Sequence, residues 1–180
     1  MSIAWVISDL HFGHKNITKY RSEFETMHQH DHTLLENVLS TVKKRDTLWI
    51  LGDCFFQEHT MDYARALSGA VENLNFIPGN HDSDTTERQE MLKEMINMGL
   101  FHNVGSMFKK GEFWLTHPPI HPAELRGKIN IHGHVHNATV PDDNYINVSA
   151  ENVFYKPVNM QQLKDERFRK TILRDYGADQ

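Results

Sequence analysis

Short apolar runs alternate along the chain with turns that carry Asp, Asn or His. Such runs, bounded by Gly and Pro, are typical of buried β-strands. The pattern therefore predicts strands at five places, each leading directly into a polar turn. These runs lie at residues 3–7, 47–51, 74–77, 113–115 and 129–131.

Two clear helical patterns occupy segments between these runs. Thr33-x-x-Glu36 has the form of a capping box, and apolar side chains follow it at helical spacing. Asp84-x-x-Glu87 predicts the start of another helix, which Gly99 would end. Both helices would pack an apolar stripe against the strands.

The remaining segments complete an α/β pattern. A weaker helix is predicted at about residues 61–67, and residues 101–148 are richer in hairpin signals, with Lys109-Lys110-Gly111 at one turn. Strands that alternate with helices, followed by a strand-rich half, predict an α/β sandwich in which mixed β-sheets are flanked by helices. Functional groups in such folds gather beyond the carboxyl ends of the strands. Five strand ends with polar turns therefore predict one shared site.

The composition is that of an ordinary globular domain. With 180 residues, 39% hydrophobic and 24% charged, the chain is expected to form a single domain over residues 1–180. It has no apolar run of membrane-spanning length and no signal-peptide pattern, so we expect no membrane span. Cys54 is the only cysteine, which excludes an intrachain disulfide, and a cytoplasmic location is expected. The net charge of -5 argues against nucleic-acid binding through a general basic face.

Thirteen histidines stand out, because histidine is both a common metal ligand and a proton carrier. Asp9-x-His11 follows an apolar run, and residues two apart in an extended backbone face the same side, so the pair can bind one cation. His134-x-His136 repeats this spacing near the other end of the series. Asp53 offers two carboxylate oxygens, which suit a bridge between two cations. Further candidate ligands are Asn80 and His117.

The candidate donors are nitrogen and oxygen atoms without a thiolate. Such a set fits Mn, Fe, Ni or Zn and argues against a Cys-rich structural zinc site. The donors are also widely separated in sequence, so the whole fold would assemble the site.

Taken in order, these motifs resemble the motif series of calcineurin-like metallophosphoesterases. The series covers about three-quarters of the chain and reads Asp9-x-His11, Gly52-Asp53, Gly79-Asn80-His81-Asp82, His117 and Gly133-His134-x-His136. Residues 8–17 resemble more closely a small bacterial and phage branch of that superfamily. Asp46-Thr47 and Asn147-Val148-Ser149 also fit that branch.

The resemblance implies the calcineurin-like sandwich fold, two divalent transition-metal ions, with manganese favoured, and a division of ligands. Asp9, His11 and His136 would bind one ion and Asn80, His117 and His134 the other, with Asp53 bridging. A bridging hydroxide would be the nucleophile. His81 would protonate the leaving oxygen or stabilise the phosphoryl group, and Asp82 would orient His81.

The implied activity is phosphate-ester hydrolysis, with a small nucleotide-type diester as the favoured substrate. A phosphomonoesterase and a nuclease are alternatives within the enzyme class, and binding of nucleic acid stays open. A non-enzymatic alternative is a scaffold that keeps the fold without catalysis. Such a scaffold is expected to lack ligands or His81, and this sequence has all of them.

Several other polar side chains have more than one interpretation. His14 and Asn16 would contact substrate phosphate, or Asn16 would instead cap a short helix. His121 is expected to be exposed in a loop and His132 to pack away from the ions. Cys54 is expected to be a small buried residue. For His28, His30 and His32 a solvated lead-in to a helix is favoured over a second metal site. Residues 164–174 alternate in charge, which predicts an exposed helix.

Overall fold

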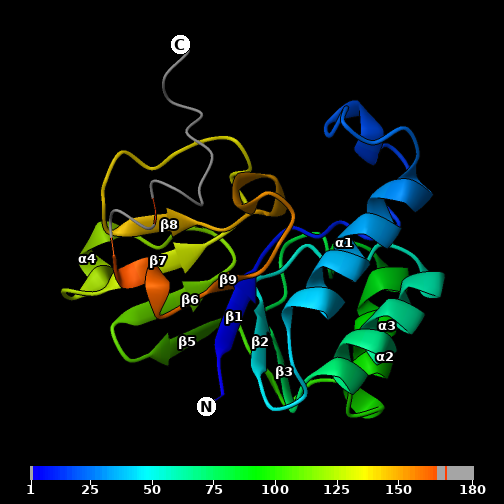
Figure 1. The fold of residues 1–180 in the computed structure, drawn as a ribbon, viewed down its shortest axis with the longest axis horizontal. Helices are drawn as coiled ribbons and strands as arrows, with labels where there is room; N and C mark the ends of the chain where they lie inside the picture. Colours follow the sequence, from blue (N-terminus) through cyan, green and yellow to red (C-terminus); the bar gives the residue numbers. More distant parts are fainter. Residues whose placement is uncertain (1, 166–168, 170–180) are drawn as a thin grey trace.

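The computed structural model describes residues 2–165 and residue 169, and it contains two β-sheets (Figure 1). The first sheet has five strands in the order β4-β3-β2-β1-β9. Neighbours from β1 to β4 pair in parallel, and β9 pairs antiparallel with β1. These strands are β1 Ala4–Ile7, β2 Thr47–Ile50, β3 Asn73–Phe76, β4 Asn103–Val104 and β9 Val158–Asn159.

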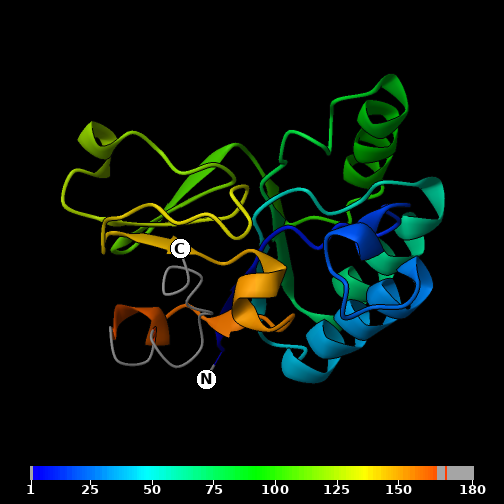
Figure 2. The ribbon, with the colours of Figure 1, turned by 90° about the horizontal axis from the view of Figure 1, so that it is seen from above.

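Three helices gather on one side of this sheet, as Figures 1 and 2 show from two directions. They are α1 Met27–Thr41, α2 Met61–Ala70 and α3 Thr86–Asn97. Each helix connects successive parallel strands, as a parallel sheet requires. The apolar side chains of Leu34, Val38 and Leu67 are fully buried against the sheet.

The second sheet has the strand order β5-β6-β7-β8. Only β5 and β6 form an antiparallel hairpin, whereas β6, β7 and β8 pair in parallel. The expectation of several hairpins was therefore wrong, because the loop with α4 Pro122–Leu125 and the segment before β8 act as crossovers. The strands are β5 Met107–Lys110, β6 Phe113–Thr116, β7 Ile129–His132 and β8 Tyr145–Asn147.

The two sheets share one hydrophobic core. Trp49 of the first sheet meets Phe108 of the second at a ring-centroid distance of 5.0 Å. Beyond the strands, the Ser8 amide donates to the Val148 carbonyl at 3.0 Å, and Ser8 forms a parallel bridge with Ser149. The ends of β1 and β8 are thereby held together, which brings the turns that follow them into one place.

The observed helix starts correct two sequence predictions. The N-cap of helix α1 lies seven residues before Thr33: Thr26 caps the helix by accepting the Gln29 amide at 3.0 Å. Helix α3 is capped by Thr85, one residue after the predicted start. Helix α2 is present as predicted and extends three residues further, and Gly99 follows α3 with a φ of +68°, as a helix-ending glycine does.

Two smaller predictions also differ from the structure. Lys109 and Lys110 belong to β5, and only Gly111 lies in the turn that follows it. The predicted exposed helix at residues 164–174 falls mostly outside the described residues. Short 3₁₀ helices complete the fold at η1 Ile17–Lys19, η2 Glu58–Thr60, η3 Ala150–Val153 and η4 Gln162–Lys164. Within the described part of the chain, none of the helices is long and apolar enough to span a bilayer.

Candidate metal centre

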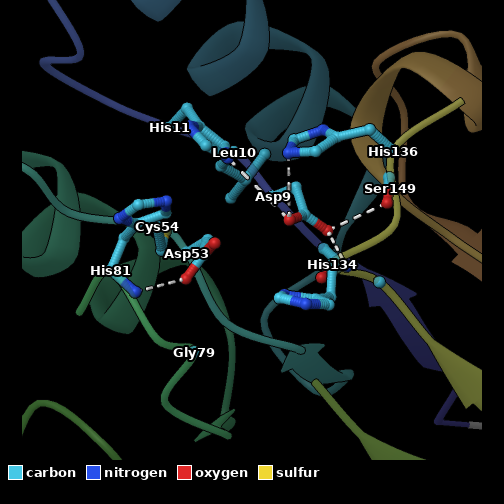
Figure 3. A network of polar contacts seen from close by, with 12 residues as sticks. Asp9, Leu10, His11, Asp53, Cys54, Gly79, His81, His134, His136 and Ser149 are labelled. Carbon is cyan, nitrogen blue, oxygen red and sulfur yellow. Dashed lines mark hydrogen bonds and ion pairs between the residues drawn. The ribbon is translucent and has the colours of Figure 1, made fainter. Parts of the chain in front are cut away.

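The turns after β1, β2, β3, β6 and β7 meet in one place, and Figure 3 shows labelled residues from the turns after β1, β2, β3 and β7 close together. Six of the predicted ligands form two groups there, and within each group the possible ligand atoms lie within 4.8 Å of one another. The first group is Asp9, His11 and His136, and the second is Asp53, His117 and His134.

Asn80, the seventh predicted ligand, lies beside the second group. Its Oδ1 atom is 3.2 Å from His117 Nε2, which is also 3.2 Å from His134 Nδ1 and 3.4 Å from Asp53 Oδ2. The structure thus brings all seven residues together, in the two groups that the family resemblance implies. A bridging role for Asp53 stays a prediction.

The backbone of most of these residues is left-handed. The φ angle is +57° at Asp9, +52° at His11, +50° at Asp53, +72° at His134 and +51° at His136. Non-glycine residues rarely adopt this conformation, and such outliers gather at functional sites. The extended geometry expected for Asp9-x-His11 was therefore wrong: the strand ends at Ile7, and tight turns aim the two side chains. For the same reason His134 and His136 point into different groups.

Two glycines allow the turns to approach closely. A Cβ atom on Gly133 would lie 2.0 Å from Ser8 Oγ and 2.2 Å from Asp9 Oδ2. One on Gly79 would lie 2.2 Å from Asp53 Oδ1. Any side chain at either position would therefore displace a predicted ligand.

The first group holds buried polar atoms that suit a cation. Asp9 Oδ2 accepts hydrogen bonds from Ser149 Oγ at 2.9 Å and from the His134 amide at 3.0 Å. In the described part of the chain, however, Asp9 Oδ1 and both ring nitrogens of His11 are buried without a hydrogen-bond partner. Unpaired buried polar atoms are costly, and a cation would satisfy these. The residues present therefore fit a bound metal ion.

The protonation of these side chains also suits metal binding. Burial lowers the pKa of His11 to about 4, so its ring is neutral at pH 7 and free to coordinate. Burial would raise the pKa of Asp9, but the neighbouring His11, His117 and His136 hold this pKa well below its usual value. At His117, burial is outweighed by the Asp53 carboxylate, which raises the His117 pKa to about 9. A metal ion bound by His117 would therefore displace a proton.

A buried carboxylate, that of Glu151, orients His136. Its Nδ1 atom donates to Glu151 Oε1 at 2.7 Å, which leaves Nε2 to face the other ligands of the first group. Glu151 Oε2 accepts from Arg21 at 2.5 Å. Burial would raise the pKa of Glu151, but the His136 hydrogen bond and the Arg21 charge outweigh it and hold the pKa at about 2. Glu151 is therefore ionised when it holds His136.

Arg21 continues this network into the core. It donates to the Asp9 carbonyl at 2.6 Å and contacts His30 Nε2 at 2.8 Å, while His30 Nδ1 lies 2.8 Å from Asp31. The second Asp31 oxygen accepts the Gly13 amide at 2.8 Å. His30 is fully buried, so the expectation of a solvated lead-in was wrong for His30, because the helix starts earlier. His28 and His32 are exposed as expected, but they lie within α1 and not in a lead-in to it.

Replacing Glu151 with Gln should lower metal affinity or turnover by about 10- to 100-fold, as is common for groups that orient a metal-ligating histidine. The amide can accept from His136 or from Arg21, but not from both. Metal titration by calorimetry and steady-state kinetics would measure the loss. Glu124→Gln removes an exposed partner of Arg126 and serves as the matched control. Equal metal affinity and equal turnover in the two variants would rule out this role for Glu151.

His81 and Asp82 differ in what they contact. The His81 ring lies 6.2 Å from the His11 ring, and its side chain is 43% exposed. Its Nδ1 atom is 2.9 Å from Asp84 Oδ2, and Arg88 bonds the other Asp84 oxygen at 2.7 Å. The prediction that Asp82 orients His81 was therefore wrong, because Asp84 occupies that position.

Asp82 instead anchors the loop that carries Asp53. Its two oxygens accept amide hydrogens from Asp53 at 2.7 Å, Cys54 at 2.9 Å, Phe55 at 3.3 Å and Gly79 at 2.7 Å. Burial raises the pKa of Asp82 to about 6, although these amides favour its ionised form. The loops after β2 and β3 are thus tied to one carboxylate.

A cavity of about 590 Å³ opens beside the first ligand group. His14 lines it, whereas Asn16 does not, and Asn16 stands at the N-cap of η1 without a side-chain capping bond. His121 is exposed and caps α4, and His132 is buried, both as predicted. Cys54 is buried as predicted, and burial raises the pKa of its thiol well above the usual value.

The residues that support the ligands were not among the predicted site residues. Ser149 belongs to the Asn147-Val148-Ser149 motif, and Asp84 lies three residues after His81. The sequence therefore pointed to both residues. It did not point to Arg21 and Glu151, because they lie 130 residues apart and are polar residues in otherwise unremarkable segments.

Comparison with known proteins gives relatives along most of the chain. No family model matches. The chain is 31% identical to the uncharacterized protein MJ1445 of Methanocaldococcus jannaschii, with 88% of each chain covered. It is 30% identical to the Gene 66 protein of Mycobacterium phage L5, with 78% of this chain and 80% of the phage protein covered.

One solved structure is similar over nearly its full length. The protein of unknown function AQ665 from Aquifex aeolicus matches with a TM-score of 0.69 and 26% identity, covering 91% of this chain and 98% of the other. A metallophosphoesterase from Sphaerobacter thermophilus matches at a TM-score of 0.43 and 16% identity, covering 75% of this chain and 61% of the other.

Proposed function

We propose that this chain, which belongs to one family with MJ1445 and the phage L5 Gene 66 protein, is a dinuclear metal-dependent phosphoesterase of the calcineurin-like superfamily. The observation that carries the proposal is the pair of adjacent ligand groups, Asp9–His11–His136 and Asp53–His117–His134. Asn80 beside the second group adds a neutral oxygen donor. Two neighbouring cation sites of nitrogen and oxygen donors suit attack on a phosphoryl centre.

Two bound cations would supply Lewis-acid chemistry, by making water acidic and by polarising the phosphoryl oxygens. The chain would hold the reacting groups in place. The His81 amide donates to Asp53 Oδ1 at 2.9 Å, so the backbone that positions a ligand also positions the His81 ring (Figure 3). Asp84 and Arg88 hold that ring at the mouth of the site, where it can donate a proton to the leaving oxygen.

The favoured substrate is a small phosphodiester of nucleotide type. The cavity beside the first ligand group supports this choice, because a diester carries a second substituent that needs room next to the phosphoryl group. Phosphomonoesterase and nuclease activity are the other outcomes that a substrate panel would separate. Manganese is the favoured metal ion.

Hydrolysis assays with the purified protein test the proposal. Chelation should abolish hydrolysis of bis-p-nitrophenyl phosphate, and added Mn²⁺ should restore it, with p-nitrophenyl phosphate as the monoester comparison. Metal content is measured in parallel. If the protein held two ions per chain and hydrolysed neither ester, the proposed enzymatic function would be refuted and a scaffold role favoured.

Replacing His81 with Asn should lower kcat by about 10²- to 10⁴-fold, the usual contribution of a general acid, while metal content stays near normal. His121→Asn is the matched control, because His121 is an exposed histidine in the loop after β6. His81 is proposed to act on the substrate and not to bind a metal ion. If His81→Asn lost metal to the same extent as activity, this role would be contradicted.

A further inference from the structure

The cavity beside the first ligand group is much larger than a phosphate. Its volume of about 590 Å³ falls in the range that holds a small organic molecule. His11, His81 and His136 form the part of the wall next to the candidate metal centre, and Ile17, Tyr20 and Tyr155 form an apolar part. A group attached to a phosphoryl centre between the two ligand groups would therefore extend into this space.

The apolar wall is built largely from rings. The Tyr155 ring is buried and fixed, since its hydroxyl donates to Glu23 and its ring packs 5.0 Å from Phe24 and 5.5 Å from the Arg21 guanidinium. Ile17 is also buried. Tyr155 and Ile17 are therefore packed in place before any ligand binds, which lowers the entropic cost of binding.

At the mouth of the cavity, two further rings continue from the metal ligands outward. His14 lies 5.6 Å from His11 in an edge-on arrangement, and Tyr20 lies 6.1 Å from His14 with the two rings inclined by 29°. The Tyr20 side chain follows η1 and is 76% exposed, which is unusual for a large aromatic residue. Its exposed face offers a stacking surface at the edge of the cavity.

The charges of the wall disfavour a second anionic group. Among the described residues that line the cavity, Arg21 is the only lysine or arginine, and it is already bonded to Glu151, His30 and the Asp9 carbonyl. Glu23 and Glu151 add two carboxylates. A neutral group is therefore favoured over another phosphate.

We propose that this cavity binds a neutral aromatic ring carried by the phosphoryl group of the substrate, with Tyr20 and Tyr155 as the residues that select for it. This inference rests on the proposed function, because the phosphoryl group would be held at the two ligand groups. It narrows the substrate class to phosphate esters with an aryl or heteroaryl substituent.

The affinities of phenylphosphonate and methylphosphonate for the Mn²⁺-loaded protein test the inference, measured by calorimetry and by competitive inhibition. Both probes present the same anion to the metal centre, and they differ only in the ring. Phenylphosphonate should bind about tenfold more tightly, and Tyr20→Ala should reduce this ratio by about fivefold. Tyr20→Phe keeps the ring and should keep the ratio. Met107→Ala, which removes an exposed apolar side chain of β5 outside the cavity, should also keep it.

The outcomes separate this inference from the proposed function. Equal affinities of the two phosphonates would overturn the ring site without contradicting the metal centre. The same holds if Tyr20→Ala leaves the ratio of the two affinities unchanged. A ring preference in a protein that hydrolyses no ester would support the ring site and overturn the proposed enzyme. Failure of both phosphonates to bind metal-loaded protein would overturn both.

Discussion

Replacing Asp53 with Asn should lower hydrolysis of bis-p-nitrophenyl phosphate by about 10³-fold or more, equivalent to roughly 4 kcal/mol of transition-state stabilisation. The amide has nearly the shape of the carboxylate but lacks its charge, and Asp53 is the only carboxylate of the second ligand group. Metal bound at His117 and His134 would therefore lose its charge partner. Kinetics at saturating Mn²⁺, together with metal content per chain, would measure both effects.

Asp62→Asn is the matched control for Asp53→Asn. Asp62 is exposed on α2 and pairs with Arg65 at 2.6 Å, so the activity of the Asp62→Asn variant should stay within about twofold of the parent protein. Full activity and full metal content in Asp53→Asn would refute the second ligand group as a metal site.

The second large effect is expected at Asp82. Asp82→Asn should lower the free energy of unfolding by about 3 kcal/mol, because its amide NH₂ would face backbone N–H donors that now bond to a carboxylate oxygen. It should also lower metal content, since the Asp53 and Gly79 backbones would shift apart. Urea unfolding and metal analysis would measure the two effects separately.

Asp46→Asn offers a control with similar chemistry at the other end of β2. Asp46 is buried and accepts from the Ile3 amide, the Trp5 indole and the Lys43 amide at 3.0, 2.9 and 3.0 Å. Its replacement should destabilise the protein without changing metal stoichiometry. If Asp82→Asn lost only stability, as Asp46→Asn is expected to, Asp82 would not position the site.

The layered α/β fold could be predicted because its signals are local. The apolar runs that form β1, β2, β3, β6 and β7 are short and end at polar turns. Their apolar side chains predict directly that these strands are buried. The parallel pairing of β6 with β7 and of β7 with β8 could not be predicted. Parallel and antiparallel neighbours bury similar side chains, and the crossover through α4 gives only a weak helical pattern of four residues.

The start of α1 shows a different limit. Thr33 followed by Glu36 satisfies a capping pattern, but Thr26 is the residue whose side chain caps the helix. Because the true start lies earlier, His30 and Asp31 face the core, where Arg21 contacts His30 and His30 contacts Asp31. A local pattern cannot distinguish two possible caps when the choice depends on a tertiary contact.

The candidate ligands could be identified from the sequence, but their conformations could not. A strand followed by Asp or His suggests a site, whereas the left-handed backbone at Asp9 and His136 depends on contacts between distant turns. The partition of His134 and His136 into separate groups came from the family resemblance and not from their spacing. The support from Glu151 and Arg21 depends on the complete fold.

Each ligand group takes residues from both sheets: the turns after β1 and β2 supply Asp9, His11 and Asp53, and those after β6 and β7 supply His117, His134 and His136. Neither group exists until the two sheets have docked, so ion capture would come after the main barrier to folding. Ions would then slow unfolding and leave the folding rate nearly unchanged. Stopped-flow measurements with Mn²⁺ and with chelator would compare the effect of the ions on the two rates. A chain that holds its ions would then be a chain that has finished folding.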